Sequence, residues 1–385
     1  MPEDPDLSER PEWQLVFVLP NLLLRDHHLS PSELTLGLEG IAIVPASDSR
    51  VVELKEWSEP AARFLSAFHD GNGTSITPAV LIVRDDWLLD MDRDVEPVIS
   101  FRNAAALSSV LLNRARNHGG GWLGASWSDT FDYHSAQLRL DGSSFDAWTP
   151  ALNSMGFQLD GLSLTCDIRL PRNDLGPIDE HLAVRLGRAW RTRYRRRRDL
   201  RATGKLFRSL EAAYEASAMR FRNYSSLSEV GLGAVDWATA VEVLASPRNA
   251  NVTKWHCTDL IAQARRDREK ELWHRKYRFQ LRTKKGKPRR FKALNLPQWI
   301  FLHVHNARSK FVHGDAVSQK LLLPFGEKAP TLLALASTVY RVALVSYLEK
   351  HWPWPRSIDD LDSIDLVPGM TYRQHLLTAV GGEDE

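Results

Sequence analysis

The chain has 385 residues and a formal net charge of +2, and its 43% hydrophobic content is ordinary for a globular protein. Two isolated cysteines, Cys166 and Cys257, exclude a disulfide-rich scaffold and argue against a cysteine-based zinc site. The polar, acidic start is unlike a signal peptide. The longest apolar stretch, 331–348, contains Arg341 and predicts a core helix rather than a membrane span. We therefore expect a cytoplasmic protein with no membrane partner.

Charge is strongly segregated along the chain. Residues 1–100 carry 19 acidic and 7 basic side chains. By contrast, residues 185–208 carry 11 basic and 1 acidic, and residues 265–292 carry 14 basic and 3 acidic. Two short, strongly basic stretches in a nearly neutral chain indicate an anionic partner, most often a nucleic acid.

The amino-terminal part of the chain mixes strand-like and helix-like patterns. Apolar runs and apolar–polar alternation between Pro, Gly, Asn and Asp residues predict strands, and spacings of three and four predict helices. The predicted strands are 13–20, 34–44, 79–83, 137–140 and 162–170, and the predicted helices are 60–69 and 103–116. We expect an acidic α+β domain over residues 1–172, with a sensory or regulatory role, and a linker rich in Pro and Gly after it.

Beyond residue 180 a helical period takes over, and no strand is predicted. The predicted helices are 206–221, 234–245, 252–281, 295–312 and 330–350. Asn295 is the expected N-cap of the fourth helix, Pro297 lies in its first turn, and Gly314 ends it. The prediction is an all-helical domain over 180–352 and an acidic tail over 353–385, so the whole chain belongs to the α+β class.

The segment 306–315, NARSKFVHGD, carries the most informative pattern. Arg308 is followed after four residues by His313, at the end of a predicted helix. A guanidinium can hold two phosphate oxygens, and a histidine can move a proton near neutral pH, so the pair suits phosphodiester cleavage. On a regular helix the two side chains point about 140° apart. They share a cleft only if the helix end unwinds near Gly314 or if a second protomer supplies one of them.

This run resembles the signature of HEPN domains. It is most similar to the Apea-like branch, in which an Arg-Ser-Lys-apolar-Val-His-Gly run is typical. The helix 235–244, VDWATAVEVL, resembles the second core helix of that family, with Glu242 at its acidic position. The resemblance covers about residues 200–352. It departs from many HEPN nucleases, which place Asn directly after the Arg, because here Ser309 follows Arg308 and Asn306 precedes it.

The resemblance implies a metal-independent endoribonuclease that needs no cofactor and works as a homodimer with both motifs facing one cleft. Arg308 would clamp the phosphate and His313 would transfer the proton, with Glu242, Asn306 and Ser309 in support. Attack by the 2′-OH would leave 2′,3′-cyclic phosphate ends. The resemblance further implies a toxin or anti-phage defence effector that acts on single-stranded RNA or tRNA, with a phage-derived trigger acting at the amino-terminal domain.

Contacts with nucleic acid are expected from both basic stretches and from the motif. These residues are Arg195, Arg196, Arg197, Arg198, Lys284, Lys285, Arg289, Arg290 and Lys310. Trp190 and Tyr194 in the first stretch, and Trp273, Tyr277 and Phe279 in the second, are expected to stack on bases. The alternative is a solvated basic face that pairs with the acidic amino-terminal domain.

Other interpretations stay open at this point. Arg308 and His313 are structural if Arg308 pairs with an acid such as Glu242 and His313 caps the helix, and Glu242 is either an orienting group or a solvated charge. His303 and His305 suggest a metal pair, but a helix separates them by about 200° and favours packing. The alternative functions are a non-catalytic nucleic-acid- or nucleotide-binding and dimerisation module, and a DNA-binding regulator.

Overall fold

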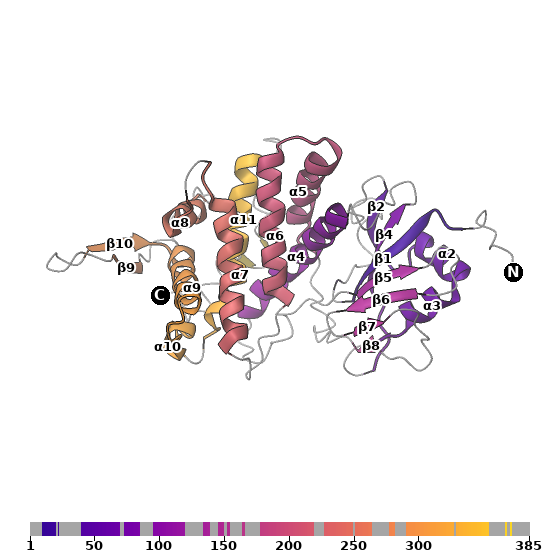
Figure 1. Cartoon of the computed structure of the whole chain (residues 1–385), viewed down its shortest axis with the longest axis horizontal. Helices are drawn as coiled ribbons and strands as arrows, with labels where there is room; N and C mark the ends of the chain where they lie inside the picture. Colours follow the sequence, from indigo (N-terminus) through magenta and orange to yellow (C-terminus); the bar gives the residue numbers. More distant parts are fainter. Residues whose placement is uncertain are drawn as a thin grey trace. The chain divides into compact units, whose positions relative to one another are not determined.

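The structure is a computed structural model with two compact units, Met1–Ser109 with Thr130–Arg196, and Val110–Asp129 with Arg197–Glu385. It describes residues 10–20, 22, 40–69, 73–84, 95–119, 134–138, 145–149, 152–154, 164–165, 178–218, 227–248, 251–263, 277–281, 290–326, 329–353, 366–367 and 370–371. The first unit holds an antiparallel sheet with helices, and the second is mostly helical (Figure 1). The predicted α+β class is therefore confirmed.

The first unit is built on a six-stranded antiparallel sheet with the order β2-β4-β1-β5-β6-β7, beside which β3 pairs with β8 in parallel. Its strands are β1 (Trp13–Leu19), β2 (Ile41–Pro45), β3 (Phe68–His69), β4 (Ala79–Arg84), β5 (His134–Leu138), β6 (Phe145–Thr149), β7 (Leu152–Ser154) and β8 (Leu164–Thr165). Its helices are α2 (Ser49–Trp57), α3 (Glu59–Ser66), α4 (Val95–Gly119), α5 (Glu180–Trp190) and the π-helical turn η4 (Arg191–Arg195). Helix α4 continues into the second unit.

The core of the first unit lies between the sheet and helices α2 and α3. Alternate residues of three strands, among them Val18, Val44 and Ile82, pack with Leu54 of α2 and Phe64 of α3. Side chains on successive strand positions point to opposite faces, so one register places all three strand residues in this core. The predicted strands 13–20 and 79–83 are confirmed, because their apolar runs match strands buried on both faces.

The second unit is a helical bundle with small hairpins. Its helices are α6 (Leu200–Ala218), α7 (Leu227–Ala245), α8 (Lys254–Ala262), α9 (Leu296–Val312), α10 (Gln319–Leu322) and α11 (Leu332–His351). Its strands are β9 (Tyr277–Leu281), β10 (Arg290–Leu294), β11 (Leu366–Val367) and β12 (Met370–Thr371). Helices α6, α7 and α11 run side by side (Figure 1), and α9 packs on α7 and α11.

Aromatic and hydroxyl groups tie the bundle together. The rings of Trp237 on α7 and Tyr340 on α11 lie 5.6 Å apart. Ser209 on α6 donates a hydrogen bond to the carbonyl of Ala240 at 2.7 Å, and its hydroxyl lies 3.0 Å from that of Tyr340. The carboxyl-terminal part of α4 belongs to this unit, since the buried Arg114 lies over the Trp237 ring at 5.5 Å.

Helix α11 is the central core helix. Thr331 caps it by accepting a hydrogen bond from the Ala334 N–H at 3.3 Å, as expected at a helix start. Among the described residues it is the one helix long and apolar enough to cross a membrane, but 78% of its apolar window is buried inside the protein. The prediction of a buried core helix in this segment is confirmed.

One predicted helix is wrong over part of its length. The helix expected over 252–281 ends at Ala262, and 277–281 forms strand β9, which pairs antiparallel with β10. The sequence YRFQL alternates aromatic or apolar with polar residues, which suits a half-buried strand once RFKAL is present to pair with it. The prediction of no strands in this half of the chain is corrected by the same hairpin.

Candidate functional site

Helix α9 carries the Arg308–His313 motif and is anchored firmly at its start. Asn295 is the N-cap, as predicted: its side chain accepts from the Gln298 N–H at 3.0 Å, and the Gln298 side chain accepts from the Asn295 N–H at 2.9 Å. The amide of Gln298 also donates to the Thr258 carbonyl of α8 at 2.9 Å. The start of α9 is therefore fixed both to its own cap and to α8.

The carboxyl end of α9 closes at His313, which is the C-cap. Gly314 follows with φ +73°, a left-handed conformation that favours glycine. The Asp315 N–H donates to the Lys310 carbonyl at 2.8 Å, and the Gly314 N–H donates to the Phe311 carbonyl at 3.1 Å. These two bonds form a Schellman motif, so the predicted stop at Gly314 is confirmed. The backbone of His313 has already left the helix, with φ −90° and ψ 2°.

Helix α7 approaches the last turn of α9 closely at Gly231. The Phe311 ring lies directly over Gly231, in the place a β-carbon would occupy. We expect Gly231→Ala to lower the free energy of unfolding by about 1–3 kcal/mol, because the ring and the last turn of α9 must shift. Urea unfolding measures this loss. Adding Phe311→Ala to Gly231→Ala makes room, so the double variant is expected to lose less than the sum of the two single variants; strict additivity would contradict this packing.

Two polar side chains of α9, His305 and Arg308, lie beside Glu242 of α7. One carboxylate oxygen of Glu242, near the end of α7, lies 3.8 Å from Nη2 of Arg308, and the other lies 3.5 Å from Nε2 of His305. His305 and Arg308 are three residues apart on α9 and so share one helix face. The Glu242 side chain is only 14% exposed. We call Glu242, His305 and Arg308 the Glu242 cluster; it favours an orienting role for Glu242 over a solvated one.

Burial sets the charges within the Glu242 cluster. Burial raises the pKa of the Glu242 carboxyl, and the charge of Arg308 opposes that shift. Burial, followed by the positive charges of Arg308 and Lys254, lowers the pKa of His305 to about 4. His305 is therefore neutral at physiological pH, and Arg308 is the charged partner of Glu242. Nε of Arg308 is buried and has no hydrogen-bond partner among the described residues, while the side chain as a whole is 32% exposed.

The low pKa of His305 makes stability depend on pH. Between about pH 4 and 6.5 the unfolded chain binds a proton at His305 and the folded chain does not, so the free energy of unfolding rises with pH in this window. We expect this residue to contribute on the order of 2 kcal/mol to that rise. Urea unfolding of wild type and His305→Asn at pH 4 and pH 7 measures the difference. Equal pH dependence in the two proteins would contradict the assigned environment.

Within the described residues, no hydrogen bond or ion pair joins the two motif residues. His313 is exposed, and within the described residues its imidazole makes no hydrogen bond or ion pair, whereas Arg308 belongs to the Glu242 cluster. The alternative in which Arg308 pairs with Glu242 is the one observed. The distance between them, 3.8 Å, is long for an ion pair and leaves the guanidinium able to bind another anion. From the sequence, His305 was considered only as half of a metal pair or as a packing residue, and its place beside Glu242 was not predicted. Its i, i+3 spacing from Arg308 was the signal that could have found it.

The remaining motif residues surround the end of α9. Asn306 is exposed and Ser309 is half-buried, with its carbonyl accepting the His313 N–H at 3.1 Å. Nζ of Lys310 donates a hydrogen bond to the Ala316 carbonyl at 3.4 Å. This bond links the residues before and after the C-cap. Ser309 and Lys310 therefore also support the local turn that holds His313.

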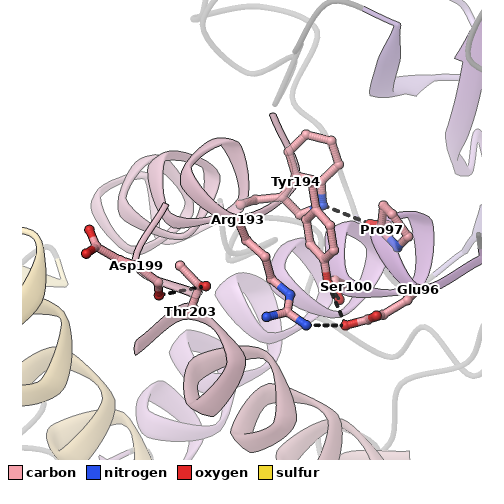
Figure 2. A network of polar contacts seen from close by, with 8 residues as sticks. Glu96, Pro97, Ser100, Arg193, Tyr194, Asp199 and Thr203 are labelled. Atoms are coloured by element: carbon pink, nitrogen blue, oxygen red, sulfur yellow. Dashed lines mark hydrogen bonds and ion pairs between the residues drawn. The ribbon is translucent and has the colours of Figure 1, made fainter. Parts of the chain in front are cut away.

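The basic run of residues 191–198 begins with side chains that are already paired. Arg193 donates to Glu96 of α4 at 2.7 Å. The hydroxyl of Tyr194 donates to the same carboxylate at 3.1 Å and lies 2.8 Å from that of Ser100 (Figure 2). Arg193 therefore follows the alternative interpretation of the basic run, because it pairs with an acidic residue of the amino-terminal half.

Trp190 corrects one prediction for this run. It is fully buried, and its indole N–H donates to the Pro97 carbonyl at 2.8 Å, so it has no free face on which a base could stack. Its ring packs against that of Tyr194 at 5.3 Å, and burial raises the pKa of Tyr194 to about 12. In this run the two aromatic side chains, Trp190 and Tyr194, hold η4 in place. The four residues Arg195, Arg196, Arg197 and Arg198 are exposed.

The second basic stretch lies largely outside the described residues. Lys284, Lys285, Arg289 and Trp273 are not described, and neither are the side chains of Phe279 and Arg290. Tyr277 is half-buried, with its ring 5.4 Å from that of Trp299. Tyr277 therefore serves packing of the hairpin on α9.

The other histidine and cysteine residues have structural surroundings. The His303 ring lies 3.9 Å from that of Trp299, whereas His305 faces Glu242, so the two imidazoles have different neighbours, as helical spacing predicts. Burial, followed by the charge of Glu242, raises the pKa of Cys257 to about 12, which keeps the thiol protonated. Among the described residues no three His, Cys, Asp or Glu side chains group as metal ligands. Cys166 lies outside the described residues.

The arrangement combines an arginine that pairs with a half-buried carboxylate and an exposed histidine at the end of the same helix. Guanidinium and imidazole groups can bind phosphate and transfer protons without a metal ion. No family model, no curated protein and no solved structure matches the chain.

Proposed function

We propose that the chain is a metal-independent endoribonuclease of HEPN type. The observation that carries the proposal is the state of Arg308: the half-buried carboxylate of Glu242 pairs with it, yet one of its donors is unsatisfied within the described chain and its side chain is partly exposed. An unsatisfied buried donor is costly, and a phosphate oxygen satisfies it. The resemblance of residues 306–315 to the HEPN signature supports the same role.

In the proposed reaction the substrate supplies the nucleophile. The ribose 2′-oxygen forms a bond to phosphorus, the bond from phosphorus to the 5′-oxygen breaks, and the product ends in a 2′,3′-cyclic phosphate. One proton leaves the 2′-OH and one reaches the departing 5′-oxygen. His313 transfers a proton in this reaction, and Arg308 stabilises the charge that develops on the phosphate oxygens.

A homodimer fits this chemistry. His313 is exposed and lies outside the Glu242 cluster, and within the described residues no hydrogen bond or ion pair joins its imidazole to Arg308. A second protomer that brings its own motif to the same cleft supplies both an arginine and a histidine to one phosphate. By resemblance to the Apea-like branch, we propose that the nuclease is a toxin or anti-phage effector acting on single-stranded RNA or tRNA, with the trigger sensed through the amino-terminal residues.

A second candidate is a non-catalytic nucleic-acid-binding and dimerisation module. This candidate is favoured by one observation: within the described residues, no hydrogen bond or ion pair links His313 to the Glu242 cluster, and a motif with a purely structural role needs no such link. The two functions differ in whether the motif is needed for cleavage.

The test pairs growth with cleavage. Full-length wild type, Arg308→Ala and His313→Ala are expressed in a bacterial host, and each purified protein is incubated with mixed RNA in EDTA. We expect only the wild type to be toxic to the host and to cleave RNA. If all three proteins bind RNA equally and none cleaves it at high concentration, the binding module is the better account.

A further inference from the structure

The hairpin β9–β10 has one face packed on the helices. Tyr277, Lys292 and Leu294 lie on this face, because Tyr277 pairs with Leu294 and strand residues two apart share a face. Leu294 is 2% exposed, and the Tyr277 ring packs against Trp299 of α9. The hairpin is therefore held against the bundle by its inner face.

The outer face of the hairpin is open and carries an aromatic ring and a positive charge. Phe291 and Ala293 lie on this face, and Arg278 joins them because it pairs directly with Ala293. All three residues are exposed, and Phe291, at 52%, is among the few large apolar side chains exposed in the described ranges. A small neighbour at 293 leaves room beside the ring of Phe291.

Two lysines flank Trp255 at the start of α8, next to the inner face. Nζ of Lys292 lies 4.5 Å from the centre of the Trp255 ring, and Nζ of Lys254 lies 5.1 Å from it. Asp259 lies 3.9 Å from Lys292 and is mostly exposed, so it offsets one charge only in part. The positive charge of Lys254 also contributes to the lowered pKa of His305, a member of the Glu242 cluster.

We infer that strand β10 and the start of α8 bind single-stranded RNA, with Lys254 and Lys292 contacting phosphates and Phe291 stacking on a base. Stacking on an exposed aromatic ring needs an unpaired base, and lysines bind phosphate as point charges. Arg308 lies about 18 Å along α9 from its first residue, so a strand a few nucleotides long reaches from the hairpin to Arg308. The inference rests on the proposed function for its choice of RNA as ligand.

The test uses a fluorescein-labelled 2′-O-methyl uridine 20-mer, whose binding to full-length protein is followed by anisotropy at several salt concentrations. This oligonucleotide has no free 2′-OH, so the measurement is independent of cleavage. We expect Phe291→Ala to weaken binding about fivefold or more without changing the salt dependence. We expect Lys292→Gln to reduce the slope of log K against log salt by about 0.7. The matched controls, Val184→Ala and Arg208→Gln, alter exposed residues elsewhere and are expected to leave both quantities unchanged.

Two results would overturn the inference. One is binding by Phe291→Ala and Lys292→Gln that equals wild type in both affinity and salt slope. The other is a poly-aspartate peptide that binds with the same dependence on Phe291, which would assign the surface to an acidic polypeptide. If binding depends on Phe291 and Lys292 but no RNA is cleaved, the inference stands and the proposed nuclease activity fails.

Discussion

Arg308→Ala is expected to lower kcat/KM for RNA cleavage by a factor of about 10²–10³, the usual cost of removing one donor to a developing oxyanion. Arg308 is held by Glu242 at 3.8 Å and has an unsatisfied Nε in the described chain, so its loss removes a positioned charge. Initial rates on a labelled RNA at several substrate concentrations measure the effect. Because the charge acts in the transition state, kcat is expected to fall more than KM rises.

Two companion variants show that the effect belongs to the guanidinium. Arg308→Lys keeps the charge but not the planar fork, so it is expected to recover only part of the activity. Arg208→Ala, at an exposed position of α6, is expected to cleave as wild type does. Full activity in Arg308→Ala, with an unchanged unfolding curve, would remove Arg308 from the mechanism.

His313→Ala is expected to lower kcat by about 10²–10⁴, the range associated with the loss of a general acid or base. The side chain is exposed and makes no hydrogen bond or ion pair within the described residues, so the substitution is expected to leave the free energy of unfolding nearly unchanged. Single-turnover cleavage and urea unfolding of the same preparations separate the two quantities.

The matched control for His313 is His351, which is also exposed and also lies at the end of a helix, α11. His351→Ala is expected to retain wild-type cleavage. A mixture of Arg308→Ala and His313→Ala protomers is expected to recover part of the activity if a shared cleft takes one residue from each chain. No recovery on mixing stably dimeric variants would contradict the shared cleft.

Local signals in the sequence were sufficient to predict both ends of helix α9. Asn295, Pro297 and Gly314 act through hydrogen bonds and backbone conformations that span only a few residues, so their roles follow from position alone. Helix α11 was predictable for a related reason, because twenty mostly apolar residues without a breaker form a buried helix. The family resemblance added Glu242, which the structure places beside Arg308.

Features that depend on distant residues were not predictable in the same way. Residues 277–281 form strand β9 by pairing with β10, and the sequence of 277–281 alone does not predict that partner. The role of Trp190 also depends on a distant residue. Its position among arginines suggested base stacking, but its N–H donates to the carbonyl of Pro97, 93 residues earlier. The neutral state of His305 also needs the tertiary structure, because it arises from burial and from Lys254 on another helix.

The central claim is cleavage by attack of the substrate's own 2′-OH without a metal ion, and the chemistry of the product ends tests it most directly. Wild-type protein in EDTA is given an RNA oligonucleotide and the same sequence with 2′-deoxy sugars, and the products are analysed by mass spectrometry. The account predicts fragments ending in 2′,3′-cyclic phosphate from the RNA and an intact deoxy oligonucleotide. Fragments with 3′-hydroxyl ends that form only when Mg²⁺ is added, or cleavage of the deoxy strand, would contradict it.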